Sequence, residues 1–178
     1  DVYKRQPYEN RDPRLKASIY YDGSKLNLET GALLSTKTGG NCALDPSNAR
    51  YTCTGYYTRK FSHYKSGRSG NLDGYFKEFR LAELYLNYAE AANEASTTGT
   101  VPNDAVDAVN AVRSRVGMPG IPYGLSCDQF RLRIRNERRV ELAFEEHRFF
   151  DVRRWKILDQ TDKVITGMKA NSDGSYSR

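Results

Sequence analysis

The residues of this chain that are best suited to chemistry lie in one segment, NERRVELAFEEHRFFDVRRW, at positions 136–155. It holds five acids, five arginines and one histidine. A pair of carboxylates could act as general acid and base, and acids beside a histidine could bind a metal ion. Acids mixed with arginines can also form ion pairs that join helices. The segment therefore allows three interpretations, which the placement of its acids on a helix distinguishes.

Helical periodicity directs two of these acids toward the interior. At helical spacing, Glu137 and Glu141 share a face with Phe130, Ile134 and Phe144. A lone charge is costly to remove from water, so carboxylates on an apolar face must be paired. We therefore predict a structural ion-pair network made of Arg80, Arg113, Glu137, Arg138, Glu141, Glu145, Arg148 and Asp151.

Within this network, residues three apart on the helix are the predicted local pairs, namely Arg138 with Glu141 and Glu145 with Arg148. A metal site is disfavoured because the arginines would repel a cation and because His147 has few acids at ligand spacing. General acid–base catalysis by Glu137 and Glu141 lacks any further sign of a substrate cleft. No catalytic residue, metal ligand or cofactor is predicted.

The elements that position these residues are amphipathic helices. One is predicted over Arg80–Ala95 and a second over 103–116, each closed by turn residues. A capping box, Ser126 with Gln129, predicts the start of a third helix that runs through the charged segment, and a short helical piece follows at Phe149–Leu158. Two helices joined by a short loop form a hairpin of the tetratricopeptide type. The expected inward stripe of the first helix is Leu81, Leu84, Tyr85, Tyr88, Ala92 and Ala95.

The chain before these helices has a different character. Residues 1–75 show short β-prone runs between turn signals and contain nine of the 13 tyrosines. Those tyrosines could pack on a half-buried sheet or form an aromatic recognition surface. We predict an irregular, β-containing segment over 1–75, a helical region over 76–166 and a disordered tail over 167–178, which is rich in Gly, Ser and Asn.

Charge and cysteine content narrow the function. The net charge is +6, and residues 1–75 carry 12 Lys/Arg against 7 Asp/Glu. A nucleic-acid binder would more often show a basic stripe without interleaved acids, so no nucleic-acid partner is predicted.

Cys42 and Cys53 could form a disulfide in an oxidising compartment, which their spacing does not decide. No stretch approaches the roughly 20 apolar residues of a membrane span. Residues 1–6 resemble a translated sequencing adapter, so no structural role is predicted for them.

Several motifs in series resemble the SusD/RagB family. FRLAELYLNYAEAANEA, VNAVRSRVGMP and the charged segment itself follow one another as in the C-terminal half of its members. DPRL at 12–15 and TGYYTRKF at 54–61 fit the part that precedes them. The resemblance implies a mostly α-helical fold with tetratricopeptide-like hairpins and an irregular ligand-facing region. It also implies that the chain is a fragment of a longer protein.

The same resemblance implies a function. Family members are surface-exposed outer-membrane lipoproteins of Bacteroidetes-type bacteria that bind nutrients, usually glycans, and are not enzymes. They cover a SusC-like TonB-dependent transporter, and their lipid anchor would lie outside this fragment. One departure is Glu146, where many members have Gly; its effect is expected to be small on an exposed face.

No ligand residue transfers by motif, because the matching motifs belong to the scaffold. The tyrosine-rich half suggests Tyr51, Tyr57, Tyr64 and Arg68 as ligand-facing groups that hold an oligosaccharide by stacking and hydrogen bonds. A helical-repeat interaction scaffold, which would expose an apolar groove and bind no sugar, is the alternative. A hydrolase using Glu137 and Glu141 is the least favoured.

Overall fold

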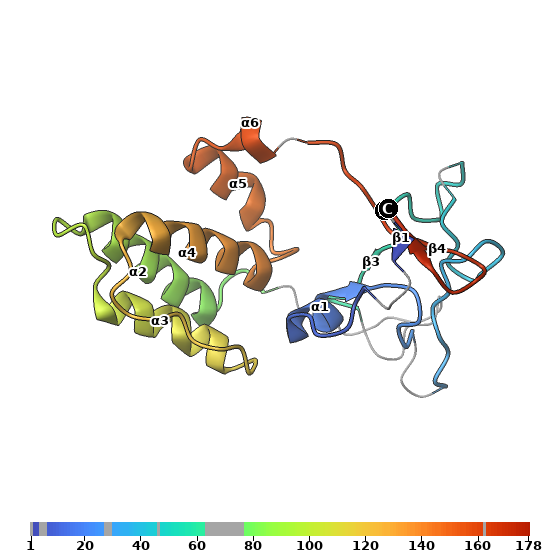
Figure 1. The fold of residues 1–178 in the computed structure, drawn as a ribbon, viewed down its shortest axis with the longest axis horizontal. Helices are drawn as coiled ribbons and strands as arrows, with labels where there is room; N and C mark the ends of the chain where they lie inside the picture. Colours follow the sequence, from blue (N-terminus) through green and yellow to red (C-terminus); the bar gives the residue numbers. More distant parts are fainter. Residues whose placement is uncertain (1, 4–6, 27–29, 46, 63–76, 162) are drawn as a thin grey trace. The chain divides into compact units, whose positions relative to one another are not determined.

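The computed structural model describes residues 2–3, 7–26, 30–45, 47–62, 77–161 and 163–178, and it divides into two compact units (Figure 1). The first contains Asp1–Arg11, Leu15–Phe76 and Asp159–Arg178, and the second contains Asp12–Arg14 and Lys77–Leu158. The chain therefore enters each unit more than once. The continuous part of the helical unit begins at Lys77, next to the boundary that the sequence suggests at Tyr75.

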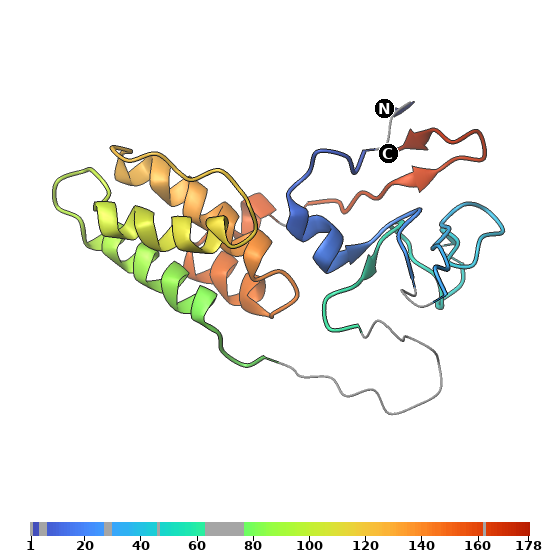
Figure 2. The same cartoon turned by 90° about the horizontal axis from the view of Figure 1, so that it is seen from below.

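The second unit is built from helices. They are α2 (Leu81–Ala95), α3 (Asn103–Ser114), α4 (Cys127–Glu141) and α5 (His147–Arg154). In both views α2 runs alongside α3 and α4, against which it packs (Figures 1 and 2). The core of this unit is formed by Leu86, Ala89, Val101, Ala105, Val106, Ala108, Val109, Val112, Ile121, Phe130, Ile134 and Leu142. The mostly helical fold and the hairpin that the sequence predicts are therefore confirmed.

Local signals set the start of α4 and the end of α3. The Ser126 hydroxyl accepts from the Gln129 backbone N–H, and the Gln129 side chain accepts from the Ser126 N–H, each at 3.2 Å. This is the predicted capping box, which satisfies two donors at the helix start. Beyond α3, Gly117 has a φ of 70°, a left-handed conformation that glycine adopts without strain.

The face of α2 that forms the core differs from the predicted one. The expected stripe is largely exposed, with Leu81 at 61% and Tyr88 at 46% accessible. The buried face instead holds Leu86 and Ala89, together with Glu90 and Asn93. Periodicity cannot choose between two faces that both contain apolar residues. The polar residues on the buried face are tolerated because they have partners; Arg154 and Trp155, for example, donate to Glu90.

The helix through the charged segment is also shorter than predicted. It ends at Glu141, and α5 begins only at His147, so Phe144 does not continue the inward face and is 46% exposed. Arg80 supplies the physical reason, because its Nη2 donates to the Glu141 carbonyl oxygen at 2.8 Å. Its Nε also donates to Glu145 Oε2 at 2.7 Å, which holds the chain in a turn. This tertiary contact satisfies a carbonyl at the helix end.

Glu146 lies in that turn with a φ of 65°, in the left-handed region. Glu146 is exposed as expected, but its left-handed backbone argues against the expectation that a residue other than glycine has little effect here. Glu146→Gly should stabilise the protein, by about 0.5–1 kcal/mol, because glycine removes the steric strain of a Cβ atom at positive φ. Thermal or urea unfolding measures the change. Glu146→Ala is the matched control, since it removes the charge and keeps the strain; an equal gain in both variants would contradict the backbone explanation.

The first unit contains short strands. The β2 strand (Ile19–Tyr20) pairs antiparallel with β3 (Tyr57–Thr58), with Ile19 opposite Thr58. A second sheet has the order β1–β5–β4, where β1 is Val2–Tyr3, β4 is Lys169–Ala170 and β5 is Tyr176–Ser177. Two short helices, α1 (Pro13–Ser18) and α6 (Leu158–Thr161), each include residues of both units.

The structure has a β-hairpin where the sequence predicts a disordered tail (Figure 2). The Gly, Ser and Asn residues form its turn, in which the Asn171 N–H donates to the Ser175 carbonyl at 2.9 Å and Gly174 has a φ of 83°. Tyr176 is buried and its hydroxyl donates to Asp22 Oδ2 at 3.3 Å. A composition typical of disorder is thus typical of a tight turn as well.

Aromatic packing holds the first unit together. The rings of Tyr8 and Tyr21 are stacked with centroids 3.9 Å apart, and Tyr176 meets Tyr8 edge-on at 5.7 Å. Burial, together with the neighbouring Tyr56, raises the pKa of Tyr8 above its ordinary range. These tyrosines serve packing, the first of the two roles that the sequence allows. Cys42 and Cys53 are free thiols.

Candidate functional site

Glu137 on α4 lies at the centre of a buried ion-pair cluster. The residue is 1% exposed. Its Oε1 accepts from Arg14 Nη1 at 2.5 Å, and its Oε2 accepts from Arg113 Nη1 at 2.6 Å. Both carboxylate oxygens are therefore neutralised by guanidinium groups from other parts of the unit.

Glu141, one turn further along α4, lies in the same cluster. It accepts hydrogen bonds from Arg14 at 2.9 Å, from Arg80 at 2.7 Å and from Arg115 at 2.7 Å. Burial alone would raise the pKa of Glu141, but the hydrogen bonds from Arg80 and Arg14 outweigh it, and the pKa lies below its ordinary value. The carboxylate is therefore held in its charged form.

A second cluster joins α4 to α5 and α2. The guanidinium of Arg138 binds Asp151 in a bidentate manner, at 3.0 and 3.1 Å, and donates to Asn87 Oδ1 at 2.6 Å. Arg154 donates to Asp151 Oδ1 at 2.8 Å and to Glu90 Oε2 at 3.0 Å. Since planar guanidinium groups match carboxylates, these contacts fix the angle of α5 on the hairpin.

The local pairs predicted on the helix differ from those observed. Arg138 pairs with Asp151 rather than with its neighbour one turn away. Arg148 forms no ion pair with any residue that the structure describes, and burial and the charge of Arg139 lower its pKa. The pattern changes because α4 ends before Arg148, so spacing along a single helix no longer applies.

Sequence reasoning missed Arg14 and Glu90 as members of the clusters, whereas it expected Arg115 to reach inward, and Arg115 donates to Glu141. Arg14 lies more than 120 positions from Glu137 and Glu141, and its signal is the DPRL motif at 12–15, which precedes the helical motifs in the chain. Asp12 orients it, with Oδ2 2.6 Å from Arg14 Nη2. DPRL contains one arginine, which could have been considered as a partner for Glu137.

The chemistry open to these carboxylates is limited. Both oxygens of Glu137 are bound by guanidinium groups and shielded from solvent, which leaves no space for a substrate beside them. Within the described part of the chain, no group of three His, Cys, Asp or Glu residues could hold a metal ion. The charged segment thus stabilises the helical unit.

Two of the four predicted ligand-facing residues lie in the described structure. Tyr51 is partly exposed in a bend, and Tyr57 lies in β3. The Tyr57 hydroxyl accepts from the Thr52 N–H at 3.1 Å and donates to the Cys42 carbonyl at 3.3 Å, so its polar tip has a structural role. Tyr64 and Arg68 fall outside the described residues.

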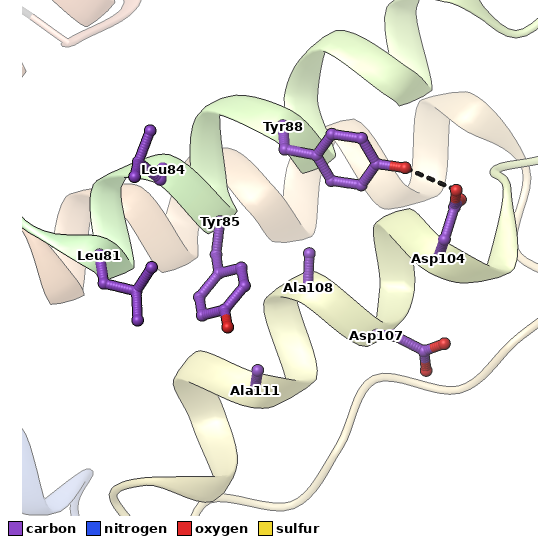
Figure 3. Close-up of a pocket in the computed structure, with 8 residues that line it drawn as sticks. All are labelled: Leu81, Leu84, Tyr85, Tyr88, Asp104, Asp107, Ala108 and Ala111. Atoms are coloured by element: carbon purple, nitrogen blue, oxygen red, sulfur yellow. Dashed lines mark hydrogen bonds between the residues drawn. The ribbon is translucent and has the colours of Figure 1, made fainter.

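An apolar groove lies between α2 and α3 (Figure 3). Its volume is about 520 Å³, and its walls are formed by the exposed α2 stripe and by small residues of α3. Two carboxylates, Asp104 and Asp107, stand on the α3 side, and the Tyr88 hydroxyl donates to Asp104 Oδ2 at 2.5 Å. The lining residues are Leu81, Leu84, Tyr85, Tyr88, Asp104, Asp107, Ala108 and Ala111.

A helical hairpin fixed by arginine–carboxylate clusters, in a chain that also forms an irregular unit with short strands, defines a scaffold of the tetratricopeptide-like class. The model of the SusD family matches residues 3–177, and the chain belongs to this family. No helix among the described residues is long and apolar enough to cross a bilayer.

Individual relatives agree with this assignment. A SusD-like protein from Bacteroides fragilis is 35% identical, with a TM-score of 0.82 over 96% of this chain and 33% of that one. A SusD-like carbohydrate binding protein from the same species is 30% identical, with a TM-score of 0.71 over 85% of this chain and 30% of that one. SusD-like protein P25 of Formosa agariphila is 41% identical over 83 residues, which are 45% of this chain and 15% of that protein. The chain spans about a third of these solved structures.

Proposed function

We propose that this protein binds glycans as part of nutrient uptake. The observation that carries the proposal is the likeness, at 30% identity and a TM-score of 0.71, to a SusD-like carbohydrate binding protein. Membership of the SusD family supports it. Binding would proceed without chemistry, which agrees with carboxylates that are saturated by arginines.

The proposed setting is the outer surface of a Bacteroidetes-type outer membrane. There the protein would deliver its ligand to a SusC-like TonB-dependent transporter, and a lipid anchor outside this chain would hold it at the membrane. The family assignment supports this proposal. No cofactor is needed for such a role.

For the ligand contacts we retain Tyr51, Tyr57, Tyr64 and Arg68 as the proposed residues. Because the hydroxyl of Tyr57 is bonded to backbone groups, its ring would be the part that contacts a sugar. No hydrogen bond from the Tyr51 hydroxyl to another described residue is present, so Tyr51 is the better residue to test.

Isothermal titration against a panel of neutral and acidic oligosaccharides tests the function. We expect binding of at least one glycan, and Tyr51→Ala should weaken it roughly tenfold, because an aromatic platform is lost. Tyr123→Ala is the matched control, since Tyr123 is an exposed tyrosine of the helical unit. If no sugar in a broad panel binds to folded protein, the proposed function is wrong.

The groove between α2 and α3 favours one second candidate, an interaction scaffold. Leu81, Leu84 and Tyr85 expose apolar surface there, and Asp104 and Asp107 add negative charge to one side. These features fit an amphipathic helix with an apolar face and a basic flank. The same titration separates the two candidates, because a scaffold of this kind would bind no sugar.

A further inference from the structure

We propose that a cavity in the first unit, lined by Arg11 and Arg178, binds an anionic group of a glycan, either a uronate carboxylate or a sulfate ester. This inference rests on the proposed glycan-binding function and adds a ligand class to it. The cavity has a volume of about 310 Å³, enough for a sugar-sized group.

The two guanidinium groups are positioned without being neutralised. Arg11 Nε donates to the Pro7 carbonyl at 3.0 Å, and Arg178 Nε donates to Thr166 Oγ1 at 2.9 Å. Within the described residues neither arginine makes an ion pair, and no acid lines the cavity. Each group therefore keeps its terminal nitrogens as donors, and guanidinium groups bind carboxylates and sulfate-like anions through such paired donors.

Two apolar side chains of the cavity lining are held by packing. Tyr56 and Met168 both line the cavity and pack on the buried Tyr8 cluster, where the Tyr8 and Tyr56 rings meet edge-on at 6.2 Å. A flat apolar wall beside cations suits an acidic sugar, because one face of a pyranose ring is apolar and the charged substituent projects from its edge.

Close backbone packing makes this wall rigid. The Met168 N–H donates to the Thr54 carbonyl at 2.8 Å. A Cβ atom at Gly167 would lie 2.2 Å from the Thr54 oxygen, and one at Gly55 would lie 2.1 Å from the Met168 oxygen. Only glycine allows the two segments to approach in this way, so the cavity is formed before a ligand arrives.

The surrounding charge also favours an anion. The first unit carries 14 Lys/Arg against 9 Asp/Glu, whereas the helical unit carries 14 against 13. A second cavity of about 330 Å³ is lined by Lys37 and Lys169, again with no acid among its lining residues. Residues 166–168 line the first cavity and residues 169–172 line the second, so the continuous segment 166–172 contributes to both cavities. A charged oligosaccharide could therefore place acidic groups at successive positions.

The test compares matched ligands and matched variants. Oligogalacturonate, a sulfated galacto-oligosaccharide and the neutral galacto-oligosaccharide of the same length are titrated into the full chain. We expect the charged ligands to bind at least tenfold more tightly than the neutral one, and Arg11→Gln and Arg178→Gln each to weaken that binding roughly tenfold or more. Arg50→Gln removes the same charge from the same unit outside the cavity and should change the affinity little. Circular dichroism confirms that each variant is folded.

Each outcome has a distinct meaning. Preference for oligogalacturonate identifies a carboxylate site, and preference for the sulfated ligand identifies a sulfate site. Equal binding of the neutral ligand, unaffected by Arg11→Gln, overturns this inference and leaves the glycan-binding function intact. Equal losses in Arg50→Gln show general charge attraction and overturn it as well. A duplex DNA bound as tightly as the sugars, with the same losses, shows a general polyanion site and also overturns it. If no sugar binds at all, the proposed function fails and this inference fails with it.

Discussion

Replacing Glu137 with glutamine is expected to destabilise the protein by about 3–5 kcal/mol, the range found when one partner of a buried ion pair is removed. The substitution keeps the size of the side chain and removes its charge. Arg113, which is largely buried, would then lose its ion pair with Glu137, and the buried Arg14 would lose one of its three carboxylate partners, in a region of low dielectric. Urea unfolding followed by circular dichroism at 222 nm measures the loss.

The control for this substitution is an ion pair between α2 and α4, the helix that also carries Glu137. Glu94 on α2 is 2.5 Å from Arg131 on α4, and its side chain is 46% exposed. Because solvent screens an exposed pair, Glu94→Gln should cost no more than about 1 kcal/mol. If the two glutamine substitutions destabilise the protein equally, burial does not determine the strength of the Glu137 cluster, and the structural role assigned to it is wrong.

The second large effect concerns acid stability and Glu141. The pKa of Glu141 in the folded protein lies below its ordinary value of 4.5. A lowered pKa contributes stability that is fully present above the ordinary value and is lost as the pH falls through the folded value. The unmodified protein should therefore lose stability steeply below about pH 4.5. Glu141→Gln should be less stable at neutral pH, by several kcal/mol, and should lose less on acidification.

Urea unfolding at a series of pH values between neutrality and strong acid measures both effects. Added salt should leave most of the difference between the two proteins unchanged, because the cluster is buried and poorly screened. Parallel stability curves for Glu141→Gln and the unmodified protein would show that Glu141 does not carry this pH dependence. The Glu94→Gln protein again provides the exposed counterpart.

Sequence patterns predicted those features of the fold that depend on local chemistry. The capping box at Ser126 and the apolar spacing of α3 lie within single elements, and the structure contains both. The inward direction of Glu137 and Glu141 also followed from spacing along one helix, and both residues are buried.

The features that could not be predicted depend on contacts between distant residues. α4 ends where it does because Arg80, on another segment, binds the Glu141 carbonyl. The buried face of α2 is chosen by α3 and α4, since α2 has apolar residues on two faces. The last residues are ordered because Tyr176 packs against Tyr8, from the other end of the chain.

The arginine cavity could not be predicted from the sequence either, because it also depends on distant residues. Arg11 and Arg178 are separated by nearly the whole chain, and neither belongs to a recognisable motif. Only the return of the chain after Leu158 to the first unit brings them to one cavity. Tyr56 is the tyrosine that lines this cavity, and the predicted Tyr51 and Tyr57 are not among its lining residues.

The division of the chain has a consequence for how such proteins can change during evolution. The helical unit includes Asp12–Arg14, which 62 residues separate from Lys77, where its continuous part begins. A recombination breakpoint near Lys77 would transfer all of the helices but leave behind Arg14, the guanidinium that Glu137 and Glu141 share. Transfer of the helices alone would therefore remove an ion-pair partner of Glu137 and Glu141, so we expect the helical region to be inherited together with Asp12–Arg14.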